Sequence, residues 1–427
     1  MLEVVDRFPL YPLVITFLLY PAAAWIVLQM APQKIRIQCF TILNVAGLAV
    51  LCWLSGAKGV RIKAALSYST IPLLFFAIYL GVVLLNYAVL RLCRRSGTIW
   101  PSAAFLLPIV FLAYIKYASA AFNPFASILA GVGLSRVAVF FIGISYLSFR
   151  LVHLVQEVRN EVVGMPNIWE YLSFAFYVPT LSVGPINPYS KFIRSLNAPD
   201  RDKTPVGRSL LRILVGFTKY IFLGSLVAQF TYAGLLRDGH PHAVIDLVIA
   251  IPAYTIYLYC NFSGFCDMAI GVSGLLGIEV AENFDRPFLA RNLQEFWTHW
   301  HMTLSAWIRD LAFTPMTKAL MRRFGSQSGN HVIAASIMIS FLVVGIWHGT
   351  GLNFLIFGAL QGFGIASVNY YTVWLKKRLG RDKFAAYRKN RLICTAAMVV
   401  TFTYFSLTLF VFANTWKQIM DIKASLE

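Results

Sequence analysis

The chain has 427 residues, of which 58% are hydrophobic and 13% are charged, and its mean hydropathy is +0.67. Soluble globular domains are roughly 45–50% apolar, so this composition excludes an ordinary soluble protein and indicates a polytopic membrane protein. The net charge of +19 comes from 37 Lys and Arg against 18 Asp and Glu. These cations stand mostly in short segments between apolar runs, which favours membrane orientation and lipid contact over nucleic-acid binding.

An apolar run of about 18 residues is long enough to cross a bilayer as a helix. We therefore expect an all-α integral membrane protein with roughly 11–13 membrane helices, counting short and re-entrant ones. In chain order the candidates are residues 10–30, 37–54, 70–90, 100–118, 125–149, 168–186, 211–232, 244–260, 268–278, 332–347, 353–373 and 392–413.

Two of these apolar stretches depart from a simple span, and so does a third apolar stretch outside this series. Residues 168–186 contain Pro179 and Pro185, which interrupt a helix. Residues 268–278 are too short to cross a bilayer, so we expect them to be buried or to reach only half-way. Residues 303–320 carry Arg309 and Asp310 in an otherwise apolar stretch and indicate a re-entrant helix.

The polar segments complete the expected topology. Residues 187–209 and 282–301 are too polar to span. Residues 376–391 are rich in Lys and Arg and contain Asp382 as their only acid, so we expect a cytoplasmic loop there. Internal repeats and linkers are not evident, which predicts one integral membrane domain over residues 1–427.

Residues 282–310 interrupt the succession of apolar runs with several charged side chains, two histidines and three tryptophans. A bilayer gives charged groups no water, so such a segment is tolerated only at the interface or in a protein-lined cavity. A later apolar run, residues 332–349, carries His348 near its end. Because imidazole can take up and return a proton near neutral pH, histidines on two such elements indicate a site.

Several short motifs stand at defined spacing in these two segments. They are E-N-F at 282–284, E-F-W at 295–297, W-H at 300–301, W-x-R-D at 307–310 and W-H-G at 347–349. This pattern resembles the membrane-bound O-acyltransferase (MBOAT) family, and weaker matches extend the resemblance over about residues 115–364. The resemblance implies helices around a central chamber and an acyltransferase activity.

The resemblance implies that His348 is the catalytic histidine. At the position of His301 the family often has histidine, and two hypotheses stay open: His301 moves protons, or it shapes the chamber through hydrogen bonds. Arg309 and Asp310 are adjacent and opposite in charge, and we expect a buried ion pair that holds the re-entrant helix. The residues expected to line the chamber or contact substrate are Trp297, Trp300, Trp347, Asn261, Asp267 and Ser305.

Three alternatives affect how these residues are interpreted. Trp297, Trp300 and Trp307 recur at helical spacing, and such a stripe serves packing or a tunnel wall. His299 and His301 are two residues apart, which suits one helical face poorly, so we expect no metal site. The six cysteines form no C-x-x-C pair and indicate small apolar residues instead of disulfides or zinc ligands.

The predicted reaction is direct acyl transfer by general-base catalysis, because neither a nucleotide-binding loop nor a G-x-S-x-G elbow is present. A thioester donor, carried by an acyl carrier protein or by coenzyme A, would reach the chamber from the cytoplasm. The expected acceptor is a hydroxyl of a bacterial envelope polysaccharide or polymer, reached directly or through an extracytoplasmic partner acyltransferase. We expect no tightly bound cofactor and a location in the bacterial cytoplasmic membrane.

The transferred group and one rival function stay open. Some motifs resemble the teichoic-acid D-alanyl transfer branch and others the alginate O-acetylation branch. Gln361 replaces a histidine that some members have, and Thr303 replaces the usual serine, so the substrate is not fixed by the pattern. The rival is a transporter or flippase without chemistry, because paired charges within a membrane would serve a transport pathway as well.

Overall fold

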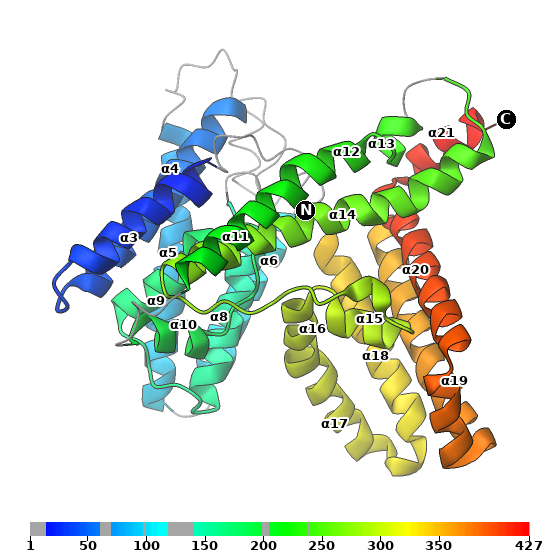
Figure 1. Cartoon of the computed structure of the whole chain (residues 1–427). Coiled ribbons are helices and arrows are strands. Elements are labelled where there is room, and N and C mark those ends of the chain that lie inside the picture. The colour runs from blue at the N-terminus through cyan, green and yellow to red at the C-terminus, as the bar shows by residue number, and fades with distance from the viewer. Residues whose placement is uncertain are drawn as a thin grey trace. The chain divides into compact units, whose positions relative to one another are not determined.

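Figure 1 shows the computed structural model, which describes residues 14–59, 70–96, 100–117, 141–198, 205–236 and 240–426. The regular secondary structure of these residues is helical, and their only β-type pairing is two isolated bridges. Seven of the described helices are long and apolar enough to cross a membrane. The expected all-α membrane protein is therefore confirmed.

The chain forms two compact units. Of the described residues, those of Phe8–Val215 and Phe265–Ala281 form the N-terminal unit, and those of Gly216–Gly264 and Glu282–Glu427 form the C-terminal unit. The prediction of one membrane domain over residues 1–427 stays a prediction.

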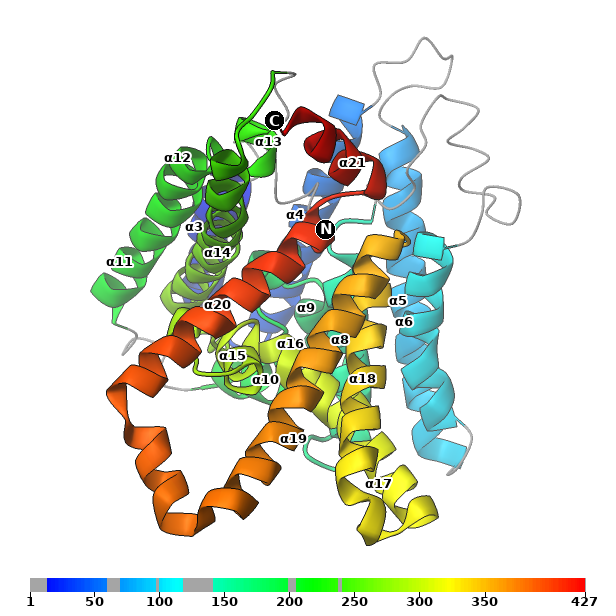
Figure 2. The same cartoon turned by 90° about the vertical axis from the view of Figure 1, so that its right-hand side faces the viewer.

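The N-terminal unit is built from helices, of which α3 to α6 have largely apolar sequences and α8 and α10 carry more polar residues. Helix α5 packs against α6, α6 packs against α8, and α4 packs against both α5 and α9 (Figure 2). The helices are α3 (Tyr20–Met30) after the π-turn Ile15–Leu19, α4 (Arg36–Gly59), α5 (Thr70–Ser96), α6 (Trp100–Tyr117), α8 (Ile144–Arg159), α9 (Ile168–Ala175) and α10 (Tyr189–Leu196). The predicted span 125–149 lies partly outside the described residues, and α8 begins only at Ile144.

A buried loop follows α9 in place of the predicted span 168–186. The guanidinium of Arg150 donates hydrogen bonds to the carbonyl of Tyr177 and to the hydroxyl of Thr180. The side chain of Asn44 accepts from the backbone N–H of Val178. Irregular backbone inside a membrane protein needs such partners, because lipid offers none. The predicted interruption is confirmed, and residues 168–186 do not form one spanning helix: α9 ends at Ala175, and Pro179 lies in the 3₁₀ turn Val178–Thr180.

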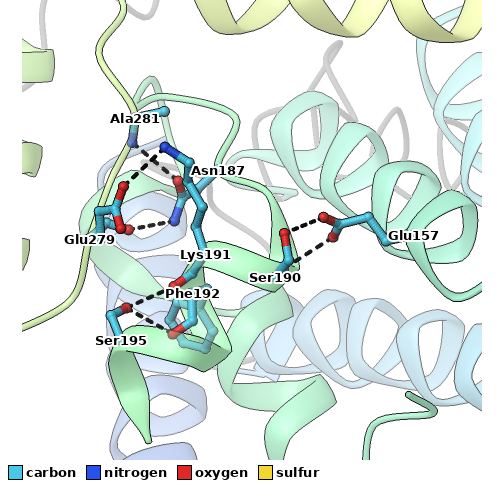
Figure 3. Close-up of polar contacts among 8 residues, drawn as sticks. All are labelled: Glu157, Asn187, Ser190, Lys191, Phe192, Ser195, Glu279 and Ala281. Carbon is cyan, nitrogen blue, oxygen red and sulfur yellow. Dashed lines mark hydrogen bonds and ion pairs between the residues drawn. The ribbon is translucent and has the colours of Figure 1, made fainter. Parts of the chain in front are cut away.

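Polar contacts fix the end of the N-terminal unit (Figure 3). The side-chain amide of Asn187 donates to the carbonyl of Glu279 and accepts from the N–H of Ala281. The carboxylate of Glu157 accepts from the N–H and hydroxyl of Ser190 at the start of α10. The segment that leads directly into the E-N-F motif is thereby held in place.

The C-terminal unit carries both histidines of the motifs. Helices α18 and α19 pack along each other, and α19 also packs against α20 (Figure 2). Its elements are the π-turn η6 (Thr218–Leu223), α12 (Gly224–Ala228), α13 (Tyr232–Leu235), α15 (Leu293–His299), α16 (Met302–Ile308), η8 (Arg309–Phe313), α17 (Thr314–Phe324), α18 (Gly329–His348), α19 (Leu352–Lys389), α20 (Arg391–Ala413) and α21 (Trp416–Ser425). Helices α11 (Val206–Phe217) and α14 (Val244–Leu275) continue from one unit into the other.

Two predictions of separate elements were wrong. The runs 244–260 and 268–278 are not separate elements, because Val244–Leu275 form one helix, α14; the expected burial of residues 268–278 is confirmed for most of them. Residues 376–389 are not a loop but the last part of α19, which is kinked at Gly380 with φ of 71°. The helical path is broken first at Gly380 and again at Asn390, whose side chain caps α20 by accepting from Ile393 N–H.

Candidate active site

His301 lies at a sharp corner between two helices. Helix α15 ends as Trp300 turns extended, and α16 begins after His301, whose φ of 45° and ψ of 51° are left-handed. A non-glycine residue in this region is strained, and such strain gathers at functional sites. An antiparallel bridge between Phe284 and Trp300 holds the corner against the E-N-F segment.

Asn283 organises this corner from within the E-N-F motif. Its backbone carbonyl accepts from Met302 N–H at 3.0 Å. Its side-chain oxygen accepts from the N–H and the hydroxyl of Thr303, at 3.1 and 2.7 Å. The same oxygen lies 3.3 Å from Nδ1 of His301. Asn283 is fully buried, so these contacts are protected from water.

The contacts of Asn283 decide which nitrogen of His301 carries the proton. A backbone N–H can only donate, so the atom that meets Thr303 N–H is the amide oxygen, and His301 Nδ1 must donate to it. The other nitrogen, Nε2, is then an acceptor; it is buried and has no hydrogen-bond partner among the described residues.

Burial also keeps the ring of His301 neutral. The side chain is 4% exposed and lies outside the seven candidate spans. Desolvation lowers the pKa of His301 to about 3. The position at the start of α16 acts in the same direction, because the positive end of a helix dipole disfavours an imidazolium. His301 is therefore a neutral hydrogen-bond acceptor at physiological pH.

Aromatic rings enclose His301. Phe262 on α14 meets its ring edge-on at 4.7 Å between centroids, and Phe284 meets Phe262 at 5.0 Å. Trp300 packs on Phe284 at 5.0 Å and is almost fully buried. These rings exclude water from the side of His301 that they cover.

The other histidine, His348, is the last residue of α18 and is half-buried. Its ring lies 4.5 Å from that of Trp347 and 4.9 Å from that of Phe412, which it meets edge-on. A Cβ on Gly349 would come within 2.4 Å of the Phe354 ring, so glycine is required directly after the histidine. The negative end of the α18 dipole stabilises an imidazolium at this position.

One hydrophobic cluster connects the surroundings of the two histidines. It contains Trp300 beside His301, and Phe357 and Phe412 beside His348. A buried hydrogen-bond chain crosses it: Trp297 Nε1 donates to Gln361 at 2.9 Å, and Gln361 donates to the hydroxyl of Thr408 at 2.6 Å. The cluster thus fixes α15, α19 and α20 against one another.

The other polar residues predicted to line the chamber have contacts within the protein. Asn261 donates to the carbonyl of Tyr257, one turn earlier on α14. Asp267 forms an ion pair with Arg212 at 3.0 Å within the N-terminal unit. The hydroxyl of Ser305 lies 3.5 Å from the carbonyl of Trp300. Their role towards substrate stays a prediction.

Two expectations about this region were wrong in detail. Arg309 and Asp310 do form an ion pair at 2.9 Å, but their side chains are 63% and 52% exposed and not buried. The three tryptophans do not share one helix, because α15 ends before Trp300 and α16 starts at Met302. The left-handed corner at His301, which helical spacing cannot reveal, separates Trp297 from Trp307.

Sequence reasoning did not assign a role to Asn283, Thr303 or Phe262. The signal for Asn283 was its place in the E-N-F motif, which stands eighteen residues before His301. In the described ranges, three or more His, Cys, Asp or Glu side chains nowhere gather closely enough to hold a metal ion.

Comparison with known proteins covers most of the chain. The model of the membrane-bound O-acyltransferase family, MBOAT, matches residues 33–413. A teichoic acid D-alanyltransferase of Streptococcus thermophilus is 31% identical over 64% of this chain and 68% of its own length. The teichoic acid D-alanyltransferase of Bacillus subtilis is 26% identical over 81% of this chain and 86% of its own length. A probable alginate O-acetylase of Pseudomonas putida is 27% identical over 68% of this chain and 61% of its own length.

Proposed function

The chain belongs to the membrane-bound O-acyltransferase family, and from this premise we propose that it moves a small acyl group from a thioester to a hydroxyl of a bacterial envelope polymer. The protein is a multi-pass membrane O-acyltransferase, so the reaction takes place within a membrane protein. The observation that carries the proposal is the pair of histidines at opposite helix ends, one of them fixed as a neutral acceptor.

D-alanyl is the acyl group that the similarities favour over acetyl. The match to the Bacillus subtilis D-alanyltransferase covers 81% of this chain and 86% of that protein. The match to the Pseudomonas putida O-acetylase covers 68% of this chain and only 61% of the longer relative. The acceptor that follows is a hydroxyl of a teichoic-acid-like polymer, and acetyl transfer to a polysaccharide is the second candidate.

His348 takes the role of general base. Its imidazole accepts the proton of the acceptor hydroxyl as that oxygen attacks the thioester carbonyl. The tetrahedral species then breaks its C–S bond, and the proton passes from the imidazolium to the departing thiolate. The products are an ester and a free thiol, so atoms and charges balance without a covalent enzyme intermediate. The dipole of α18 stabilises the imidazolium that forms.

His301 takes the role of a positioning group. A pKa of about 3 makes it a weak base, so it is poorly suited to remove a proton. Its Nε2 can accept a hydrogen bond from the acceptor hydroxyl or from an amide of the donor arm. Such a bond in a water-poor site aligns the reactants before attack.

The donor is proposed to dock on two exposed basic helix ends of the C-terminal unit. One is the end of α17, with Lys318, Arg322 and Arg323; the other is residues 376–391 at the end of α19. The two lie at the same end of that unit (Figures 1 and 2). Carrier proteins are typically acidic, so association should weaken as salt rises. Charge reversal at either helix end should weaken carrier binding, whereas equal binding by both variants at all salt concentrations would place docking elsewhere.

The inner-membrane location and the direction of transfer belong to the same proposal. A thioester made in the cytoplasm reaches His348 from that side, and the polymer reaches it from the outer side. The basic end of α19 is then cytoplasmic.

Reconstitution tests the proposed function. The protein in lipid nanodiscs receives a D-alanyl carrier thioester or acetyl-coenzyme A, together with a hydroxyl-bearing polymer. The expected result is ester formation on the polymer with release of one thiol per ester. If neither donor yields ester while proteoliposomes carry an envelope precursor across the bilayer, the transporter alternative replaces the enzyme.

A further inference from the structure

One arginine is fully buried in the N-terminal unit. Arg150 lies on α8, is 1% exposed, and is the largest of the fully buried side chains that the structure describes. A guanidinium stays protonated in proteins, so its positive charge cannot be relieved by loss of a proton. Buried charges are normally paired, because moving an ion out of water is costly. The partners of Arg150 therefore show how far this charge is compensated.

The partners of Arg150 are neutral. Its guanidinium donates to the carbonyls of Phe174 and Tyr177, each at 3.4 Å, and to the hydroxyl of Thr180. In the described part of the chain no carboxylate pairs with it, and the ionisable groups that interact with its charge are tyrosines. Its Nε, which can only donate, is buried and has no hydrogen-bond partner there. Dipoles thus hold the arginine, but negative charge does not balance it.

A tyrosine hydroxyl one helical turn away also lacks a hydrogen-bond partner. Three tyrosines interact with the charge of Arg150, namely Tyr79, Tyr146 and Tyr177. Tyr79 donates to a backbone carbonyl at 3.1 Å, and Tyr177 donates to the hydroxyl of Ser273 at 2.8 Å. Tyr146 is 2% exposed, and its hydroxyl has no partner among the described residues. Because Tyr146 precedes Arg150 by four residues on α8, the two side chains lie on one face of the helix.

These two groups need the same kind of ligand. The Nε–H of Arg150 can only donate, and the phenol of Tyr146 has a proton to donate. An anion accepts from both and supplies the negative charge that the neutral partners lack. A water molecule would accept from both but would leave the guanidinium uncompensated. Since both side chains are buried, a polymer phosphate, a lipid headgroup or the arm of an acyl donor is too large to reach them.

The two groups lie where α8 meets the buried loop after α9. A Cβ on Gly143, directly before α8, would clash with the carbonyl of Leu181, so the helix start and the loop are in close contact. The left-handed φ of 69° at Gly143 is one that glycine adopts without strain. Arg150 attaches the same loop through Tyr177 and Thr180. A ligand that balances the charge of Arg150 therefore stabilises the loop as well as the helix.

We propose that Arg150 and Tyr146 bind a small monovalent inorganic anion of the size of chloride inside the N-terminal unit. The anion accepts hydrogen bonds from Nε of Arg150 and from the hydroxyl of Tyr146, and it balances the guanidinium. It takes no part in acyl transfer and stabilises the contact between α8 and the loop. The proposal goes beyond the proposed function and does not depend on it.

Thermal unfolding in two salts tests this anion site. The whole chain in lipid nanodiscs is unfolded over a series of chloride concentrations, with gluconate, which is too large for the site, keeping the ionic strength constant. Because the anion binds the folded protein, the thermal midpoint should rise with chloride and then saturate. Equal midpoints in chloride and gluconate would overturn the proposal.

Three variants assign the chloride effect to the two side chains. Tyr146→Phe should raise the half-saturating chloride concentration by roughly fivefold or more, because it removes one hydrogen bond to the anion. Arg150→Met should abolish the chloride dependence. Arg159→Met removes an exposed cation from the same helix and should behave as the parent protein. If Arg150→Met does not fold, Tyr146→Phe decides alone, and an unchanged chloride dependence in that variant would contradict the site.

Bromide locates the anion directly. Bromide is a halide close to chloride in size, and its anomalous X-ray scattering identifies it in crystals of protein purified throughout in bromide. We expect an anomalous peak in contact with Nε of Arg150 and the hydroxyl of Tyr146. Peaks confined to the protein surface would overturn the proposal and leave water as the partner of the two groups.

Discussion

The two histidines of the C-terminal unit sit at opposite ends of helices. His301 precedes the first residue of α16, is almost fully buried, and is held by Asn283 through a hydrogen bond. His348 is the last residue of α18, is half-buried, and is surrounded by aromatic rings. A helix start disfavours an imidazolium and a helix end favours one.

The two histidines therefore have the same side chain but surroundings that suit two different roles. Burial and the helix start keep His301 neutral, with one defined acceptor nitrogen. The helix end prepares His348 to hold a positive charge for the moment between proton uptake and release. We infer that His348 moves the proton and that His301 aligns what reacts.

The largest effect should follow from removing His348. His348→Ala deletes the base, so acyl transfer should fall roughly 10²–10⁴-fold while thermal unfolding of the protein stays close to normal. His299→Ala is the matched control, because that histidine is part-exposed beside Asp285 and should keep its activity. A His348→Ala protein with more than about a tenth of the transfer rate would remove His348 from the base role.

A smaller loss should follow from removing the side chain that orients His301. Asn283→Ala leaves the N–H of Thr303 and Nδ1 of His301 without their acceptor. Losing a buried hydrogen bond costs about 1–3 kcal/mol, so if this cost falls on the transition state the transfer rate should fall roughly 5- to 160-fold. Thr303→Ser keeps the hydroxyl and should stay near the parent rate. Full activity of Asn283→Ala would show that the tautomer of His301 does not matter.

The smallest effect concerns pH and stability. In the folded protein the pKa of His301 is lowered to about 3 by burial, whereas an unfolded histidine titrates near 6.5. The contribution of neutral His301 to the free energy of unfolding is therefore fully present above pH 6.5. It is lost as pH falls towards 3, because the unfolded chain takes up a proton that the folded protein does not, and the loss is up to about 1.4 kcal/mol per pH unit. The advantage of the parent protein over His301→Gln in thermal midpoint should shrink between pH 7.5 and 4.5. A constant advantage would mean that His301 is not shielded from protons.

Much of the architecture could be predicted from apolar run length alone. The runs beginning near residues 37, 70, 332 and 392 became α4, α5, α18 and α20, with ends shifted by a few residues. The errors came where local pattern and tertiary contacts disagree. Pro179 marked an interruption but not the buried loop around it, because that loop depends on Asn44 and Arg150 from distant helices.

The sequence motifs indicated which residues belong to the candidate site but not how those residues are arranged in space. The W-H-G motif indicated His348, and the structure adds that it ends a helix. The left-handed backbone of His301 and its contact with Asn283 could not be read from spacing, because they arise from pairing between segments eighteen residues apart. The exposure of Arg309 and Asp310 is also a tertiary property.

The most direct test of the central claim compares one conservative substitution at each histidine. Glutamine retains a hydrogen-bond acceptor at the distal position but cannot act as a base near neutral pH. Single-turnover transfer is measured with His301→Gln and His348→Gln at saturating donor and acceptor. We predict that His301→Gln retains transfer within about tenfold of the parent protein, whereas His348→Gln loses roughly 10²–10⁴-fold. Equal losses at both positions would contradict the division of labour and show that the two histidines move the proton together.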